Sequence, residues 1–207
     1  MTTVVVLAGG PDRPAVIALP PGATVIAADG GAELGGPIDL LVGDLDSISA
    51  ETLAGIEHVE RYAADKDATD LELALTAALR LEPERILVLG SAGGRLDHLL
   101  GSLLILAAEP YAGVQVDAQI GRAAVHVVRG ERTLSGEPGE LISLFAVHGT
   151  VSGVVTEGLV YPLRAEMLEP GSSRGLSNVF AASEARISLE RGVLLAVRPS
   201  GNATAAG

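Results

Sequence analysis

Short apolar runs alternate with amphipathic segments in the first half of the chain. Four runs consist almost entirely of apolar residues and end at glycine or aspartate, and they lie at residues 3–8, 24–28, 38–42 and 85–90. Continuous apolar runs of this length are typical of strands that are buried on both faces of a sheet.

Helical periodicity appears between the third and fourth runs. The leucines of ATDLELALTAALR recur every four residues, which predicts an amphipathic helix. Thr69, followed by Glu72, matches a capping box, so we expect this helix to begin at about Asp70. A second helical segment, RLDHLLGSLLILAA, follows a pair of glycines. Strands that alternate with helices in this way predict an α/β parallel sheet up to about residue 118.

The pattern changes after Gly121, where helical periodicity disappears and short β-type runs recur between glycine-containing turns. The runs are AVHVV, ELISLFAV, TVSGVV, SNVFAA, ARISLE and GVLLAV. Such spacing favours an antiparallel β sandwich or barrel. We therefore expect an α/β parallel-sheet domain over residues 1–120, followed by an all-β sandwich domain over residues 121–207.

Composition restricts both the core and the available chemistry. Only two Phe, three Tyr and no Trp are present, so the core must be built from Val, Leu, Ile and Ala. The absence of Cys excludes disulfides, thiolate catalysis and Cys-ligated zinc. Four scattered His residues, none spaced i,i+4, disfavour a His-rich metal site. Any metal would therefore be held by oxygen, which indicates magnesium or calcium.

The net charge of −12 argues against nucleic acid and against anionic lipid as partners, because both require a basic surface. No apolar stretch approaches the length of a membrane span, and the first residues lack a basic start and a cleavage site. We expect a soluble, cytoplasmic protein.

Seven aspartates follow the predicted strands or begin the predicted helices. In an open α/β sheet the ligand crevice lies at the carboxyl ends of the strands, so these residues should converge there. Each also has an ordinary explanation in a helix cap or a turn. The seven are Asp29, Asp44, Asp46, Asp65, Asp67, Asp70 and Asp97.

Asp44 and Asp46 are harder to explain as caps or turns. Alternate residues of an extended chain point to the same side, so the two carboxylates should face each other. Without a cation, one of the two would have its pKa raised. A divalent metal removes the repulsion, and Mg²⁺ is typically held by one or two carboxylates together with substrate phosphates.

The segment LGSAGGRLDH indicates a phosphate site between a strand and a helix. Its glycines leave backbone N–H groups free to receive an anion at the helix start, and Arg95 adds a permanent cation. A simple helix-capping turn is the alternative, and neither the Walker pattern nor GxGxxG is present. Lys66 is the only lysine of the chain and lies among three aspartates.

A predicted metal site and a predicted phosphate site both lie at the carboxyl ends of the strands. Together they indicate a nucleotide-dependent phosphoryl or pyrophosphoryl transferase. A DxD motif also occurs in haloacid-dehalogenase-like phosphatases, but those need a later lysine and none follows Lys66. It occurs too in metal-dependent glycosyltransferases, which would leave DKDATD and GGRLDH unexplained. A non-catalytic nucleotide sensor on the same fold is the alternative from a different class.

These motifs, taken in order, resemble the thiamin pyrophosphokinase family. The segments that carry the likeness are ADGGA at 28–32, VGDLDSI at 42–48, DKDATDLELAL at 65–75, GSAGGRLDH at 90–98, GLVYPL at 158–163 and SSRGLSN at 172–178. The resemblance implies an α/β catalytic domain, a substrate-binding β domain, and a homodimer with its active sites between subunits. It also implies transfer of the pyrophosphoryl group of ATP to thiamin, with release of AMP.

The resemblance further implies residue roles. Asp44, Asp46 and Asp70 would surround Mg²⁺ and the triphosphate, with Asp97 close by, and either Asp70 or Asp97 would accept the hydroxyl proton. The nucleotide side would be lined by Asp29, Gly30, Lys66, Thr69, Ser91, Gly94 and Arg95. Thiamin would contact Tyr161, Ser177 and Asn178.

Some positions depart from the family pattern. Tyr161 stands where the family often has Trp, which would reduce the aromatic surface under the substrate. It could instead be an ordinary buried aromatic of a β domain. Glu33 stands where Asn commonly follows ADGGA, and the segment between Asp29 and Asp44 is short.

Overall fold

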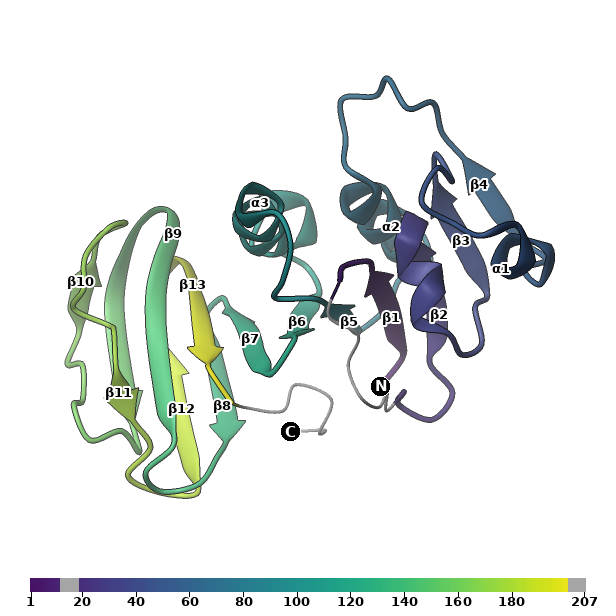
Figure 1. Cartoon of the computed structure of the whole chain (residues 1–207). Coiled ribbons are helices and arrows are strands. Elements are labelled where there is room, and N and C mark those ends of the chain that lie inside the picture. The colour runs from purple at the N-terminus through teal and green to yellow at the C-terminus, as the bar shows by residue number, and fades with distance from the viewer. Residues whose placement is uncertain (12–18, 201–207) are drawn as a thin grey trace. The chain divides into compact units, whose positions relative to one another are not determined.

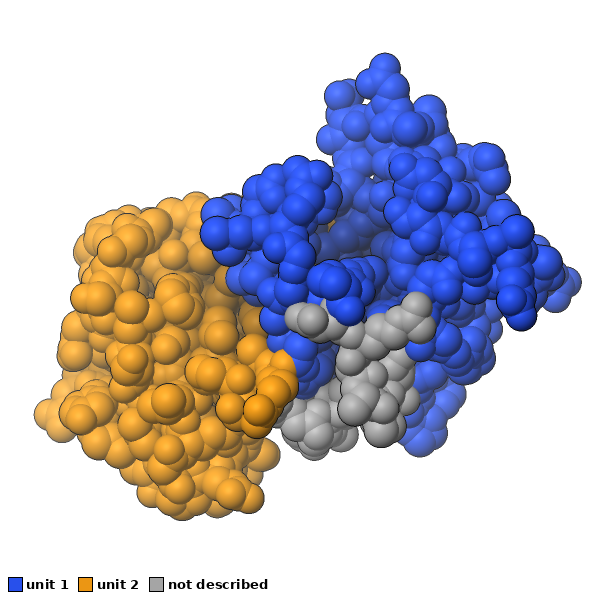
Figure 2. Space-filling model, in the orientation of Figure 1, with its two compact units in different colours: residues 1–105, 114–121 blue, residues 106–113, 122–207 orange. Residues whose placement is uncertain are grey.

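The structure, a computed structural model, describes residues 1–11 and 19–200. Contacts divide the chain into two compact units, which Figure 2 shows in different colours. The first unit comprises Met1–Ile105 and Val114–Gly121, and the second comprises Leu106–Gly113 and Arg122–Gly207.

The first unit is built on a parallel sheet with the strand order β4-β3-β2-β1-β5-β6. Its strands are β1 (Thr3–Ala8), β2 (Thr24–Ala28), β3 (Leu40–Gly43), β4 (Val59–Arg61), β5 (Arg85–Gly90) and β6 (Gln115–Ile120) (Figure 1). The four predicted strands and their parallel pairing are confirmed. Residues 59–61 were not predicted as a strand, because only three residues pair and two of them are exposed.

The register of this sheet brings several strand ends to one edge. Ala8 pairs with Ala28, and Ala28 pairs with Val42, so the chain leaves β1, β2 and β3 at nearly the same level. β1 and β5 form the buried centre, with no residue exposed in either strand. An aliphatic core of this kind agrees with the composition.

Helices in the first unit begin where local signals predict them. They are η1 (Asp29–Leu34), α1 (Ala50–Ala54), α2 (Asp70–Leu79) and α3 (Leu96–Leu106). α2 begins at Asp70 as predicted, because Oγ1 of Thr69 accepts a hydrogen bond from the N–H of Glu72 at 3.2 Å. In the part of the chain that is described, no helix is long and apolar enough to span a membrane.

The second unit is antiparallel, with the strand order β7-β13-β9-β12-β8 and with β10 and β11 paired to β9. Its elements are η2 (Glu109–Tyr111), β7 (Ala123–Val128), β8 (Glu131–Ser135), β9 (Leu141–Glu157), β10 (Glu166–Leu168), β11 (Asn178–Val179), β12 (Glu184–Ser188) and β13 (Arg191–Arg198) (Figure 1). The predicted antiparallel character is confirmed.

The long strand β9 corrects one prediction. ELISLFAV and TVSGVV looked like separate strands, because Gly149 separates them as a turn would. In the structure both belong to β9, whose first part pairs with β13 and whose end pairs with β12. The described chain is thus mostly β, with few helices, and combines parallel and antiparallel pairing.

Candidate active site

Three carboxylates from separate parts of the first unit meet at the edge where β2 and β3 end. Asp29 is the first residue of η1, Asp44 follows β3, and Asp70 is the first residue of α2. One ligand oxygen from each lies within 4.8 Å of the others. The parallel register explains why the residues after β2 and β3 become neighbours.

Asp29 is the most deeply placed member of this acidic group. It is 8% exposed, and its Oδ1 has no hydrogen-bond partner among the described residues. Its φ of 41° is left-handed, which is uncommon for a residue other than glycine. A buried carboxylate oxygen without a partner is costly unless a cation or a donor satisfies it. The acidic group therefore suits a bound cation.

Gly43 makes the approach of these carboxylates possible. A Cβ at this position would lie 2.9 Å from Cβ of Asp29 and 3.1 Å from Oδ1 of Asp70. A larger residue would thus push into the acidic group. Sequence reasoning missed this role, although a glycine directly before the first aspartate of GDLD was the available signal.

Lys66 supplies a positive charge to the acidic group. Its Nζ donates a hydrogen bond to Oδ2 of Asp44 at 3.2 Å and lies 2.7 Å from Oδ1 of Asp70. The second contact is an ion pair by distance, although its alignment leaves Oδ1 of Asp70 without a hydrogen bond. The bond from Lys66, followed by that from the N–H of Asp46, lowers the pKa of Asp44. Desolvation would lower the pKa of Lys66, but Asp70 and Asp44 together raise it.

The arrangement of Asp44 and Asp46 differs from the prediction. Leu45 has a φ of 69°, so the chain turns instead of staying extended, and the expectation that both side chains share one side was wrong. Asp46 is exposed, its N–H donates to Oδ1 of Asp44 at 3.4 Å, and Ser47 donates to its Oδ1 at 2.8 Å. A raised pKa was also expected for one of the pair, yet the pKa of Asp44 is lowered by Lys66.

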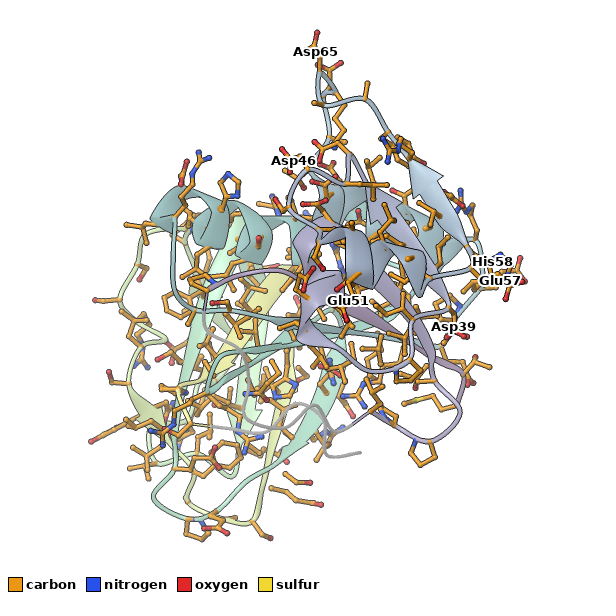
Figure 3. The ribbon with its side chains drawn as sticks, turned by 45° about the vertical axis from the view of Figure 1, so that its right-hand side comes forward. Asp39, Asp46, Glu51, Glu57, His58 and Asp65 are labelled. Atoms are coloured by element: carbon orange, nitrogen blue, oxygen red, sulfur yellow. The ribbon has the colours of Figure 1, made fainter. Side chains whose placement is uncertain are left out.

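The segments next to the acidic group hold it in place. Gly30 packs against Ser47, since a Cβ on Gly30 would lie 3.4 Å from Cβ of Ser47. Glu33 accepts a hydrogen bond from the N–H of Ser49 at 2.8 Å, which ties η1 to the segment after β3. Figure 3 shows Asp65 at the outer end of the loop before α2.

The glycine turn after β5 lies beside the loop that follows β1. Oγ of Ser91 accepts from the N–H of Gly93 at 3.1 Å, and Gly94 has a φ of 90°. A Cβ on Gly94 would lie 3.2 Å from Cδ of Pro11, and one on Gly10 would overlap the side chain of Ser91. Gly10 is a second position that sequence reasoning missed, signalled only by the glycines after LA in the first strand.

Arg95 and Asp97 form an exposed pair at the start of α3. Nε and one terminal nitrogen of Arg95 donate to the two carboxylate oxygens of Asp97, at 3.2 and 2.6 Å. The hydrogen bond from Arg95 lowers the pKa of Asp97 to about 2. Asp97 thus pairs with Arg95 and is not a member of the acidic group.

In the second unit, Tyr161 and Asn178 are bonded to each other. Tyr161 is 59% exposed, so it is not an ordinary buried aromatic. Asn178 is buried and bonds to the main chain of Tyr161 through both ends of its amide. Ser177 is exposed, has a φ of 54°, and donates its N–H to Oγ of Ser143 at 3.1 Å.

Comparisons with known proteins match both halves of the chain. The family model described as "Thiamin pyrophosphokinase, catalytic domain" matches residues 21–116, and "Thiamin pyrophosphokinase, vitamin B1 binding domain" matches residues 125–194. A curated thiamine pyrophosphokinase from Bacillus subtilis is 31% identical over 172 residues, which cover 75% of this chain and 76% of that protein.

Solved structures give the same result. The crystal structure of thiamine pyrophosphokinase from Bacillus subtilis has a TM-score of 0.82 at 25% identity, covering 97% of this chain and 100% of that chain. A thiamin pyrophosphokinase family protein from Enterococcus faecalis has a TM-score of 0.80 at 26% identity, covering 98% of this chain and 100% of that chain.

Proposed function

The chain belongs to the thiamin pyrophosphokinase family, and from that premise we propose that it transfers the pyrophosphoryl group of ATP to thiamin. The products are thiamin diphosphate and AMP. The observation that carries the proposal is the acidic group of Asp29, Asp44 and Asp70, where a buried oxygen of Asp29 has no hydrogen-bond partner among the residues that the structure describes. This group lies within the stretch that matches the catalytic-domain model.

Asp29, Asp44 and Asp70 are the residues that would hold a divalent ion. Carboxylate oxygens are the ligands that Mg²⁺ prefers, and Mg²⁺ would neutralise the phosphate oxygens of ATP. The DxD pattern predicts Asp46 as a further ligand. Its exposed side chain lies outside the acidic group, so this role stays a prediction.

Other residues of the first unit would bind and align the triphosphate. Lys66 balances part of the negative charge of the acidic group, and Thr69 keeps Asp70 at the helix start through its cap. The turn with Ser91 and Gly94 would offer backbone N–H groups to phosphate oxygens. Arg95 would add a cation, and Asp29 and Gly30 would line the same edge. Alignment and charge neutralisation are the main requirements of this reaction.

Asp70 and Asp97 were the two candidates for the proton acceptor. In the reaction, the hydroxyl oxygen of thiamin bonds to the β-phosphorus, the bond from that phosphorus to the oxygen of the α-phosphate breaks, and the hydroxyl proton leaves. A general base works best with a pKa near the working pH, whereas the pKa of Asp97 is about 2. We therefore propose Asp70 as the proton acceptor and assign Asp97 to holding Arg95.

The second unit would bind thiamin at the site that is formed by Tyr161, Ser177 and Asn178. Support comes from the exposed ring of Tyr161 and from the match of residues 125–194 to the vitamin B1 binding model. The finer layout proposed is an α/β catalytic domain up to about residue 120 and a β-sandwich domain after it. The break between the two units at Gly121 supports that division.

We also propose a cytoplasmic homodimer. Leu96, Leu100 and Leu104 are exposed and four residues apart on α3, so they form an apolar stripe on one face of the helix. An exposed stripe of this kind is expected where a subunit is covered. Light scattering at several concentrations would test the oligomeric state.

The alternatives make different predictions for one assay. The enzyme should convert ATP and thiamin into AMP and thiamin diphosphate, whereas a sensor would bind both without forming AMP. Chromatography of the nucleotides after incubation separates the two. The matches described above give no support to a glycosyltransferase.

A further inference from the structure

The side chain of Asn178 holds both main-chain polar groups of one residue, Tyr161. Its Oδ1 accepts from the N–H of Tyr161 at 3.0 Å, and its Nδ2 donates to the carbonyl of Tyr161 at 2.7 Å. The N–H of Val179 also donates to Oδ1, at 2.9 Å. Since an amide oxygen has two lone pairs, both acceptor positions of Asn178 are used. Asn178 is 4% exposed.

These bonds continue a short antiparallel pairing. Leu159 forms a bridge with Phe180, and the N–H of Val160 donates to the carbonyl of Val179 at 2.9 Å. At Tyr161, the residue after Val160, the side-chain amide of Asn178 takes the place of a main-chain peptide group, because it carries the same kinds of donor and acceptor. The main chain of Tyr161 is therefore held although it lies outside the strands.

The residues after Tyr161 restrict its main chain further. Pro162 has a fixed φ and limits the preceding residue to extended conformations. Leu163 is anchored to Thr156, which accepts its N–H at 2.8 Å and donates to its carbonyl at 3.1 Å. With the main chain fixed, the exposed ring of Tyr161 keeps only its two side-chain torsions. A tyrosine held in this way offers a large contact surface at low entropic cost.

We propose that Asn178 is a positioning residue that fixes the ring of Tyr161 as the surface on which thiamin stacks. This inference rests on the proposed function, because it takes thiamin as the ligand. The rings of thiamin, one of them cationic, suit an aromatic face. Ser177 would form the direct hydrogen bond to thiamin. Its exposed position and its left-handed φ of 54° are consistent with a binding residue.

The first test needs no ligand. The chain contains no Trp, so Tyr161→Trp places a single indole at the position in question. Its time-resolved fluorescence anisotropy reports local motion of the ring. Adding Asn178→Ala should increase the fast, local decay, whereas Ser143→Ala, which removes a bond to Ser177 instead, should not. Equal decays with and without Asn178→Ala would overturn the proposal.

The second test is a double-mutant cycle on thiamin affinity, measured by calorimetry with thiamin itself. With Tyr161 present, Asn178→Ala should weaken binding about tenfold, and with Tyr161→Ala it should change binding by less than about twofold. In turnover, Asn178→Ala should raise the KM for thiamin and leave kcat nearly unchanged. An equal loss in both backgrounds would mean that Asn178 contacts thiamin directly, and would overturn the proposal.

Two controls keep the outcomes distinct. If Asn178→Ala does not fold, Asn178→Asp keeps the acceptor for Tyr161 and Val179 and replaces the donor by an oxygen that faces the carbonyl of Tyr161, so it should increase the fast, local decay as well. If the unaltered protein binds no thiamin, the proposed function fails, whereas the ligand-free anisotropy still decides whether Asn178 positions residue 161.

Discussion

The ammonium group of Lys66 lies 2.7 Å from Oδ1 of Asp70, at the edge of the sheet where the carboxylates of the acidic group meet. Lys66 is the only lysine of the chain, and its side chain is 14% exposed. Three carboxylates and one ammonium leave two net negative charges in this group, which match a divalent cation.

Replacing Lys66 should separate its effect on metal affinity from its effect on turnover. The variant Lys66→Met should bind Mn²⁺ about five- to tenfold more tightly, because Mn²⁺ no longer competes with the ammonium of Lys66 for the carboxylates. Electron paramagnetic resonance of free Mn²⁺ measures this affinity. Turnover should fall, since the charge is lost near the triphosphate. Arg80→Met removes an exposed cation that pairs with Glu60, and serves as the control. Weaker Mn²⁺ binding in Lys66→Met would contradict this account.

The four aspartates of the proposed metal site should differ in their effects. Asp44→Asn should reduce Mn²⁺ affinity and turnover by about a hundredfold or more, because it removes a ligand without removing volume. The same change at Asp29 and Asp70 should act similarly. Asp46→Asn should reduce turnover as strongly only if the exposed carboxylate turns toward the ion. Near wild-type affinity in Asp44→Asn, measured at saturating ATP, would rule out the acidic group as the metal site.

A methyl group at position 43 should damage the site and spare the fold. Gly43→Ala places Cβ 2.9 Å from Cβ of Asp29 and 3.1 Å from Oδ1 of Asp70, so one carboxylate must move. Circular dichroism should show a folded protein with weakened Mn²⁺ binding. Gly101→Ala is the matched control in α3, because its Cβ meets nothing within 4 Å. It should raise stability by about 0.5 to 1 kcal/mol. Equal metal affinity in both variants would refute the steric role of Gly43.

The exposed pair of Arg95 and Asp97 predicts a pH effect. Because the pKa of Asp97 is lowered to about 2, its stabilising contribution is complete above the ordinary value of 3.8 and is lost as the pH falls through about 2. Arg95→Gln should raise this pKa toward 3.8, which a carboxyl NMR titration would detect. An unchanged titration would show that Arg95 does not hold Asp97. Under the proposed roles, in which Asp70 and not Asp97 accepts the proton, the acidic limb of the pH profile of kcat should be the same in this variant as in the unaltered protein.

Local signals in the sequence predicted the elements of the first unit well. The start of α2 at Asp70 depends on Thr69, three residues from its bonding partner, so the sequence contains the whole signal. Apolar runs likewise indicate strands at the buried centre, where every residue faces the core. The short strand β4 lacks that signal, because its residues are exposed or only partly buried.

The arrangement of the site depends on contacts that no local pattern records. The left-handed Leu45 turns Asp46 away, and leucine is not a residue that predicts such a conformation. Asp29 joins the acidic group because Ala28 and Val42 pair in the sheet, and Gly43 leaves the necessary space. The bonds of the buried Asn178 amide could not be predicted from a local pattern either, since their partner, Tyr161, is 17 residues away in the sequence.

The products of one reaction test the central claim most directly. The protein would be incubated with Mg²⁺, thiamin and ATP labelled at the β-phosphate, and the products separated by chromatography. We predict AMP and thiamin diphosphate in equal amounts, with the label in thiamin diphosphate, and about a hundredfold less of both products with Asp44→Asn. ADP with thiamin monophosphate, or bound thiamin without any AMP, would contradict the assignment.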